Sequence, residues 1–187
     1  FNRTEELAKE PIFLLAGRMI AEKGIKEYIE AARIVKKKMG HKARFLLAGG
    51  FDKNPTSYGQ KEFDELNYDG AVDYVGDQRD MKKLYEKASI YVLPSYREGV
   101  PRSSLEAMSM KMPIITTDVP GCRETVEDGV NGYLVPLYSV EKLSEKMEKF
   151  VSDDSLIKKM GKESYKMVED KFDVIKVNQT YLKEMEF

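Results

Sequence analysis

The sequence predicts an α/β fold: a Rossmann-like, doubly wound parallel sheet of about six strands, with helices on both faces and a C-terminal helical tail. Two observations predict it. Short apolar runs recur between residues 12 and 135, and segments with apolar residues at helical spacing lie between them. After residue 136 only the helical pattern continues. Strands that alternate with helices need crossover connections, and these give parallel strands with helices packed on both faces of the sheet.

Six apolar runs are predicted to be strands, because each is short and rich in the aliphatic and aromatic residues of buried strands. The runs cover residues 12–16, 44–48, 72–75, 90–93, 113–117 and 132–135. No linker, low-complexity segment or internal repeat separates them. The sequence therefore predicts one domain.

Helices are predicted wherever apolar residues repeat three or four positions apart, since such residues share one helix face. The stripes are Ile25, Tyr28, Ile29, Ala32, Val35 and Met39; then Met81, Leu84, Tyr85 and Ala88; then, in the tail, Leu143, Met147, Phe150 and Val151, followed by Leu156, Met160 and Met167. A helix is also expected from about Leu105, and a last one from about Val174.

Composition limits the function classes. The net charge is −1, with 31 basic and 32 acidic residues, so no overall field attracts nucleic acid. A single cysteine, Cys122, excludes an intramolecular disulfide and fits a reducing, cytoplasmic location. The chain contains no apolar run of the roughly 18–20 residues that cross a bilayer. The N-terminus is not typical of a signal peptide and lacks an initiator Met, which suggests a piece of a longer protein.

Glycine and polar residues gather directly after the predicted strands. In doubly wound sheets, ligands bind beyond the carboxyl ends of the strands, where the strand order reverses. The loops concerned are residues 17–24, 49–52, 76–78, 94–98 and 118–123. A binding site is therefore expected among these loops.

Two carboxylates, Glu98 and Glu106, lie eight residues apart across a strand–loop–helix junction. Ser103 and Ser104 are expected to cap that helix, and Gly99 lets the loop backbone approach a ligand. The free amides of a helix N-terminus suit a phosphate or diphosphate, whereas carboxylates accept hydrogen bonds from sugar hydroxyls. A nucleotide sugar offers both partners. The alternative is a polar loop followed by an ordinary amphipathic helix.

Arg18 and Lys23 stand five residues apart between the first strand and the first helix. Together the arginine fork and the compact lysine charge can neutralise a diphosphate, including one that leaves during sugar transfer. The alternative is that both side chains pair with nearby acids such as Glu22 and Glu27.

The absence of several known motifs argues against other function classes. No G-x-G-x-x-G follows the first strand, which argues against a dinucleotide oxidoreductase. The sequence contains no His/Cys cluster typical of zinc and no Asp-x-Asp pair typical of a metal-dependent transferase. The lysines at 36–38 indicate a solvated helix surface, with contact to an anionic membrane as the alternative.

With these loops in place, the chain resembles the C-terminal, donor-binding half of a GT-B glycosyltransferase of the large retaining family 4. The resemblance covers about residues 12–136 and, more loosely, the helical tail. Five markers occur in the family's order, and the combination is specific although each is common. They are Gly17-Arg18 with Lys23-Gly24, residues 91–95, the E-x7-E pair Glu98 and Glu106, residues 113–124, and residues 129–136.

The resemblance implies a role for each matching position. Arg18 and Lys23 would hold the donor diphosphate, and Glu98 would bind hydroxyls of the transferred sugar close to the reacting carbon. Glu106 would accept hydrogen bonds from the ribose. The catalytic set is thus Arg18, Lys23 and Glu98, and the other donor-binding positions are Gly17, Gly76, Gly99, Val100, Ser103 and Glu106. No metal and no cofactor are expected, since the two cations and the helix end supply the positive charge.

The resemblance also implies a function for the whole protein. Residues 1–187 would be the nucleotide-sugar donor domain, and the N-terminal acceptor domain is absent from this chain, so the isolated chain should be inactive. The full-length enzyme would be a retaining hexosyltransferase, with a UDP-sugar favoured, that builds polysaccharide, capsule or lipid-linked glycan. It would be cytoplasmic, with peripheral contact to the inner membrane face as an option. Competing interpretations are a stand-alone nucleotide-sugar-binding subunit that works with a separate acceptor protein, a binding domain with degenerate loops, and a sugar-nucleotide epimerase.

Overall fold

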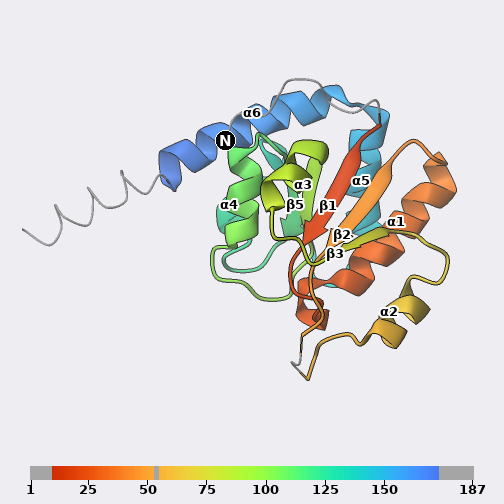
Figure 1. The fold of residues 1–187 in the computed structure, drawn as a ribbon. Coiled ribbons are helices and arrows are strands. Elements are labelled where there is room, and N and C mark those ends of the chain that lie inside the picture. The colour runs from red at the N-terminus through yellow and green to blue at the C-terminus, as the bar shows by residue number, and fades with distance from the viewer. Residues whose placement is uncertain (1–9, 53–54, 173–187) are drawn as a thin grey trace, which may run out of the picture.

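A computed structural model describes residues 10–52 and 55–172, which form a single six-stranded sheet with helices on both faces (Figure 1). All strand pairs are parallel, and the order is β3-β2-β1-β4-β5-β6. The strands are β1 Ile12–Ala16, β2 Arg44–Ala48, β3 Asp73–Gly76, β4 Ile90–Leu93, β5 Ile114–Thr117 and β6 Gly132–Val135. The order reverses between β1 and β4, so a ligand crevice is expected there.

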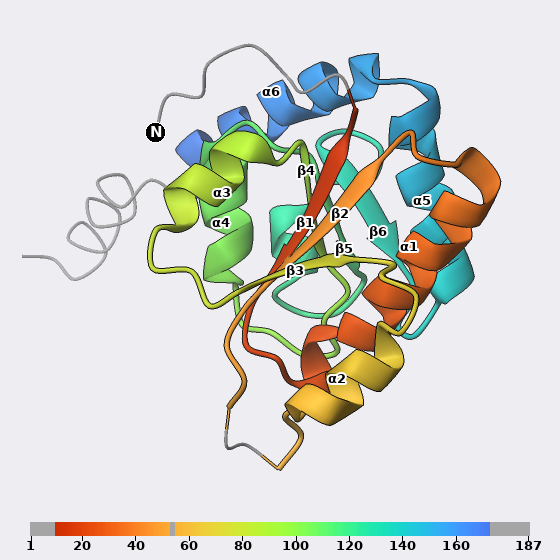
Figure 2. The ribbon, with the colours of Figure 1, turned by 45° about the vertical axis from the view of Figure 1, so that its right-hand side comes forward.

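The helices pack in two layers (Figure 2). They are α1 Ile25–Met39, α2 Gln60–Leu66, α3 Met81–Lys87, α4 Arg102–Ser109, α5 Val140–Ser152 and α6 Ser155–Lys171, with short 3-10 turns η1 Ala21–Lys23 and η2 Arg123–Thr125. Helices α1, α2 and α5 pack on one face of the sheet, and α3 and α4 on the other. Helix α6 runs along one end of the molecule and contributes to both layers.

Strand β1 shows how the sheet separates two hydrophobic cores, one on each face. Every residue of β1 is buried, and its side chains alternate: Phe13 and Leu15 join the α1 layer, while Ile12, Leu14 and Ala16 join the α3 and α4 layer. A parallel strand that is covered on both faces therefore appears in the sequence as a continuous apolar run.

The predicted fold class and all six strands are confirmed, although the third strand is shifted by one residue and the fifth begins one residue later than predicted. The predicted stripes lie in α1, α3, α5 and α6. Helix α2 was not predicted, because Phe63 is its single buried residue and so gives no apolar stripe. The helix expected from about Val174 lies outside the described residues.

The expected serine cap of α4 is wrong. The residue at the N-cap is Pro101, and no side chain caps the helix. Ser103 and Ser104 lie inside the first turn because the helix begins at Arg102, earlier than the apolar string from Leu105 indicated. The Ser104 hydroxyl is buried without a hydrogen-bond partner.

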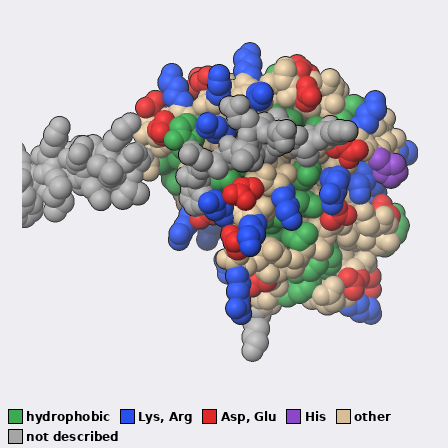
Figure 3. Space-filling model, turned by 45° about the horizontal axis from the view of Figure 1, so that its top comes forward, with side chains coloured by type: hydrophobic (Ala, Val, Ile, Leu, Met, Phe, Trp, Pro, Cys, Tyr) green, Lys and Arg blue, Asp and Glu red, His purple; other side chains and the backbone are tan. Residues whose placement is uncertain are grey.

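Charged side chains of both signs are interspersed over the face shown in Figure 3, in keeping with the net charge of −1. In the run 36–38, Lys36 donates to the carbonyl of Gly70 at 3.0 Å and Lys38 pairs with Glu148 at 2.8 Å. Two of these lysines therefore have partners within the chain. Among the described residues, none of the helices combines the length and the apolar character that crossing a bilayer requires.

Candidate functional site

Two loops meet where the strand order reverses, one after β1 and one after β4. The backbone of Gly24 is left-handed, with φ 70°, and a Cβ there would lie 2.1 Å from the carbonyl oxygen of Pro94. The amide of Tyr96 donates to the carbonyl of Glu22 at 2.8 Å. The loops are thus held together beyond the carboxyl edge of the sheet, where ligands bind in such folds.

A pocket of about 410 Å³ opens at this edge. Its lining comes from the ends of β1, β2 and β3 and from α3 and α4. The lining residues are Ala16, Gly17, Arg18, Ala48, Gly49, Gly50, Phe51, Asp52, Asp77, Gln78, Met81, Tyr85, Ser103 and Glu106. Lys23 does not line the pocket but lies close behind it, since a Cβ on Gly17 would be 3.6 Å from Cδ of Lys23.

Arg18 lies at the pocket with its side chain 61% exposed, and its Nη1 is 3.2 Å from Oδ2 of Asp52. An exposed ion pair of this kind contributes about 0–1 kcal/mol, so Arg18 can exchange the carboxylate for a phosphate at little cost. A hydrogen bond from Thr56 and, less strongly, the charge of Arg18 lower the pKa of Glu22. Arg18 is therefore able to take an anionic ligand in the pocket.

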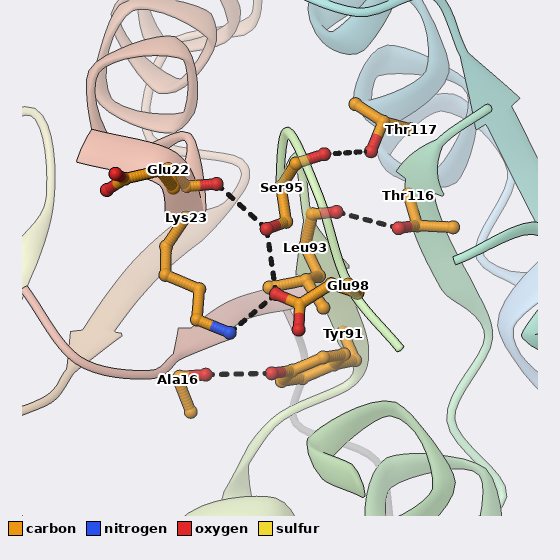
Figure 4. Close-up of polar contacts among 9 residues, drawn as sticks. All are labelled: Ala16, Glu22, Lys23, Tyr91, Leu93, Ser95, Glu98, Thr116 and Thr117. Carbon is orange, nitrogen blue, oxygen red and sulfur yellow. Dashed lines mark hydrogen bonds and ion pairs between the residues drawn. The ribbon is translucent and has the colours of Figure 1, made fainter. Parts of the chain in front are cut away.

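Lys23 and Glu98 form an ion pair that joins the two loops (Figure 4). Nζ of Lys23 is 2.5 Å from Oε1 of Glu98, and their side chains are 19% and 14% exposed. The hydroxyl of Ser95 lies 2.7 Å from the same carboxylate oxygen and 2.8 Å from the carbonyl oxygen of Glu22. A hydroxyl has one hydrogen, so Ser95 donates to one of these acceptors at a time. Thr117 donates to the Ser95 carbonyl and so fastens this loop to β5.

The alternative in which Arg18 and Lys23 pair with the nearby Glu22 and Glu27 is wrong. Both cations pair with acids, but these acids come from the loops after β2 and β4. The carboxylate of Glu27 instead accepts a hydrogen bond from Tyr96 at 2.8 Å. The pairs therefore connect loops across the sheet edge.

Glu106 lies in the second turn of α4 and lines the pocket. Its Oε2 accepts a hydrogen bond from Tyr85 at 3.1 Å, and its Oε1 is 3.3 Å from Nε of Arg102. The Arg102 side chain is 91% exposed and that of Glu106 is 36% exposed. A carboxylate has about four lone-pair sites, so Glu106 retains capacity to accept hydrogen bonds from a ligand.

The other predicted binding residues fall into three groups. Gly17 and Ser103 line the pocket. Gly76 lies beside it, where its carbonyl accepts from the first amide after β2 at 2.9 Å. Gly99 and Val100 lie in the exposed loop before α4 and do not line the pocket. The structure thus brings four of the nine predicted residues into one pocket, namely Gly17, Arg18, Ser103 and Glu106.

Several pocket residues were not predicted. Asp77 and Gln78 follow β3, in a strand-end loop that the sequence did indicate, so their polar character was a usable signal. Met81 and Tyr85 belong to the apolar stripe of a predicted helix. A side chain can pack in a core and line a pocket with its far end, and periodicity does not distinguish the two.

The pocket combines an arginine at its edge, the first turn of α4 and a carboxylate. The arginine and the helix N-terminus favour an anion, while Glu106 favours hydroxyl groups. Within residues 10–52 and 55–172, His, Cys, Asp and Glu side chains form no group of three that could hold a metal ion. The arrangement suits a ligand that carries both phosphate and hydroxyls.

Cys122 is fully buried, and burial raises the pKa of its thiol. A raised pKa lowers the thiolate fraction, and the thiolate is the reactive form. We expect the folded chain at pH 8 to resist a disulfide reagent that labels the same chain at once in guanidinium chloride. Absorbance of the released thiolate measures the rate. Equal rates in both states would contradict the buried placement.

Comparisons with known proteins identify the family of the chain. The family described as "Glycosyl transferases group 1" matches residues 1–167. N,N'-diacetylbacillosaminyl-diphospho-undecaprenol alpha-1,3-N-acetylgalactosaminyltransferase from Campylobacter jejuni is 38% identical over 156 residues, which are 83% of this chain and 39% of that protein. The chain therefore spans well under half the length of this relative.

Two solved structures share the fold. A mutant of TarM from S. aureus, in complex with fondaparinux, alpha-GlcNAc-glycerol and UDP, superposes with a TM-score of 0.84 at 26% identity, covering 98% of this chain and 37% of that one. The C-terminal domain of a glycosyl transferase group 1 family protein, LpcC from Francisella tularensis, has a TM-score of 0.79 at 25% identity and covers 93% of this chain and 96% of that one. The chain belongs to the group 1 glycosyl transferases and corresponds to their C-terminal domain.

Proposed function

We propose that this chain is the donor-binding half of a retaining glycosyltransferase and that its pocket holds a nucleotide diphosphate sugar. The observation that carries the proposal is the pocket itself: it lies at the strand-order reversal and combines Arg18, the first turn of α4 and Glu106. The family membership and the UDP bound to the TarM mutant support a nucleotide ligand. We propose UDP as the nucleotide of the donor.

The proposed roles are those that the family resemblance implies for these positions. Arg18 and Lys23 hold the diphosphate, and Glu98 orients the transferred sugar. Glu106 accepts hydrogen bonds from the ribose, and the backbone at Gly99 and at Val100 approaches the sugar. No metal or cofactor takes part in this proposal, because the cations and the helix end neutralise the leaving diphosphate.

The activity of the whole protein is a further part of the proposal. A second domain would bind the acceptor and exclude water, so the isolated chain should bind nucleotide weakly and transfer nothing. The Campylobacter relative acts, by its name, on a diphospho-undecaprenol substrate, and this supports a lipid-linked glycan or polysaccharide as the acceptor. Such an acceptor would place the full-length enzyme at the inner face of the membrane. Neither the family match nor the named relative supports the alternative of a stand-alone subunit.

Calorimetric titration of the chain with UDP, GDP, ADP and their sugars tests the proposal. We expect one diphosphate to bind in the high-micromolar to millimolar range and the corresponding monophosphate to bind more weakly. A folded sample that binds none of these compounds would exclude a nucleotide-sugar site.

The two glutamates should affect binding differently. Glu106→Ala is expected to weaken binding of the nucleotide alone by about tenfold, the effect of one hydrogen bond to a charged group. Glu98→Ala should leave nucleotide affinity within about threefold and remove the preference among donor sugars. Titration of both variants with UDP and with two UDP-sugars measures this. A matched control is Glu145→Ala, which removes an exposed acid paired with Lys142 on α5. Equal effects of Glu98→Ala and Glu106→Ala would refute the assignment.

A further inference from the structure

Tyr85 occupies an unusual position for a core aromatic residue. It lies on α3, is 3% exposed and belongs to the core beneath α3 and α4. Its ring packs edge-on against Tyr91 with centroids 6.1 Å apart. Its other end reaches the pocket, of which it is a lining residue. The ring is thus fixed by packing while the hydroxyl faces the site.

The Tyr85 hydroxyl has two acceptors within reach. Oε2 of Glu106 lies at 3.1 Å and the carbonyl oxygen of Ser103 at 3.4 Å. A phenol has one hydrogen, and hydrogen bonds to charged acceptors are the stronger ones, so Glu106 is the main partner. The second partner of Glu106, Arg102, is 91% exposed and holds the carboxylate only loosely. Tyr85 is therefore the rigid contact of this carboxylate.

Burial raises the pKa of Tyr85 far above its usual range, with smaller contributions from Tyr91 and Glu106. The phenol stays protonated at any working pH and acts only as a donor to the carboxylate. The contact occupies one site on Oε2 and leaves the remaining lone pairs of Glu106 available to the pocket.

We infer that Tyr85 is a positioning residue for ribose recognition: its hydroxyl fixes Glu106 in the orientation that accepts hydrogen bonds from the ribose 2′- and 3′-hydroxyls. The inference rests on the proposed function, since it concerns the same pocket. A glutamate side chain loses rotamer freedom when it binds a ligand, and a contact formed beforehand removes part of that cost. The chemical consequence is a preference for ribonucleotides over 2′-deoxyribonucleotides that depends on a residue acting through Glu106.

The test compares each nucleoside diphosphate with its 2′-deoxy form, UDP with dUDP, GDP with dGDP and ADP with dADP, by NMR titration of the 187-residue chain. The wild-type chain should favour the ribose form of its nucleotide by about tenfold. Tyr85→Phe should weaken the ribose form by about fivefold and the deoxy form by less than twofold, because the deoxy form lacks the 2′-hydroxyl and offers the aligned Glu106 only its 3′-hydroxyl. A purely structural role would weaken both forms equally.

A matched control is Tyr28→Phe. Tyr28 is likewise a buried tyrosine, but its hydroxyl donates to the carbonyl of Leu46 at 3.1 Å in the core beneath α1, away from the pocket. Loss of this hydroxyl should lower the melting temperature about as much as Tyr85→Phe does and leave the ribose preference unchanged. In a Glu106→Ala background, Tyr85→Phe should have no further effect on nucleotide affinity.

Each outcome decides the inference. A smaller ribose preference in Tyr85→Phe with the deoxy affinity retained supports it, and an unchanged preference overturns it while the proposed function stands. If no wild-type titration shows binding, the proposed function and the inference both fall. If Tyr85→Phe does not fold, Glu106→Asp replaces it, because the shorter carboxylate loses contact with Tyr85 but keeps its charge. Retention of the full ribose preference in Glu106→Asp would then overturn the inference.

Discussion

Replacing Gly24 by alanine is expected to destabilise the chain by more than about 4 kcal/mol, or to prevent it from folding. The added Cβ would lie 2.1 Å from the carbonyl oxygen and 2.7 Å from the carbonyl carbon of Pro94, and both are backbone atoms. Backbone atoms on two neighbouring loops cannot move independently, so the loop after β1 must separate from the loop after β4. Denaturant unfolding followed by circular dichroism measures the loss.

Gly24 is the N-cap residue of α1, and the glycine at the other end of α1 supplies a matched control. Gly40, at the C-terminus of α1, has φ 67° and ψ −145°, a backbone conformation more demanding than that of Gly24 at φ 70° and ψ 32°. No atom lies within 4 Å of a Cβ added there. Gly40→Ala therefore reports backbone strain alone, roughly 1–3 kcal/mol. If Gly24→Ala costs no more than Gly40→Ala, the close approach to Pro94 is not what holds the loops together.

The strands and the main helices could be predicted because their burial is written into the local sequence. Strands buried on both faces appear as short apolar runs, and α1 appears as a stripe from Ile25 to Met39. Helix α2 buries only Phe63, and α4 begins at a residue that carries no apolar signal. The sequence pattern therefore predicts a helix or strand reliably only where that element buries a large apolar face.

The candidate site could be predicted only in part, and the reason differs from that for the helices. The loops could be chosen because carboxyl ends of parallel strands share one edge, which places Arg18 and Glu106 on the same pocket. Contacts between loops depend on which strands are neighbours, and a single sequence does not reveal that β4 lies beside β1. The pair of Lys23 with Glu98, separated by 75 residues, could not be predicted for that reason.

Removal of the Lys23 charge is the second substitution with a large expected effect. In Lys23→Met, the Glu98 carboxylate, 14% exposed, would keep only the hydroxyl of Ser95 as a partner among the contacts described. Breaking a buried ion pair on one side costs about 3–5 kcal/mol, and partial exposure of this pair lowers the expected loss to roughly 2–3 kcal/mol. Denaturant unfolding should show this loss. Nucleotide titration should show weaker binding, because the variant lacks one of the two cations proposed to hold the diphosphate.

The double variant Lys23→Met/Glu98→Gln separates the two consequences. A neutral amide no longer needs a cation, so the double variant should regain about 1–2 kcal/mol of the stability lost in Lys23→Met. Nucleotide affinity should not recover, because the Glu98→Gln change restores no positive charge toward the diphosphate. The exposed pair of Lys26 with Glu30, 4.0 Å apart, gives the control, and Lys26→Met should change stability by less than about 0.5 kcal/mol. If the double variant is as unstable as Lys23→Met, the pair is not the reason for the loss. If it also recovers nucleotide binding, Lys23 acts on the ligand only through the loop that it holds.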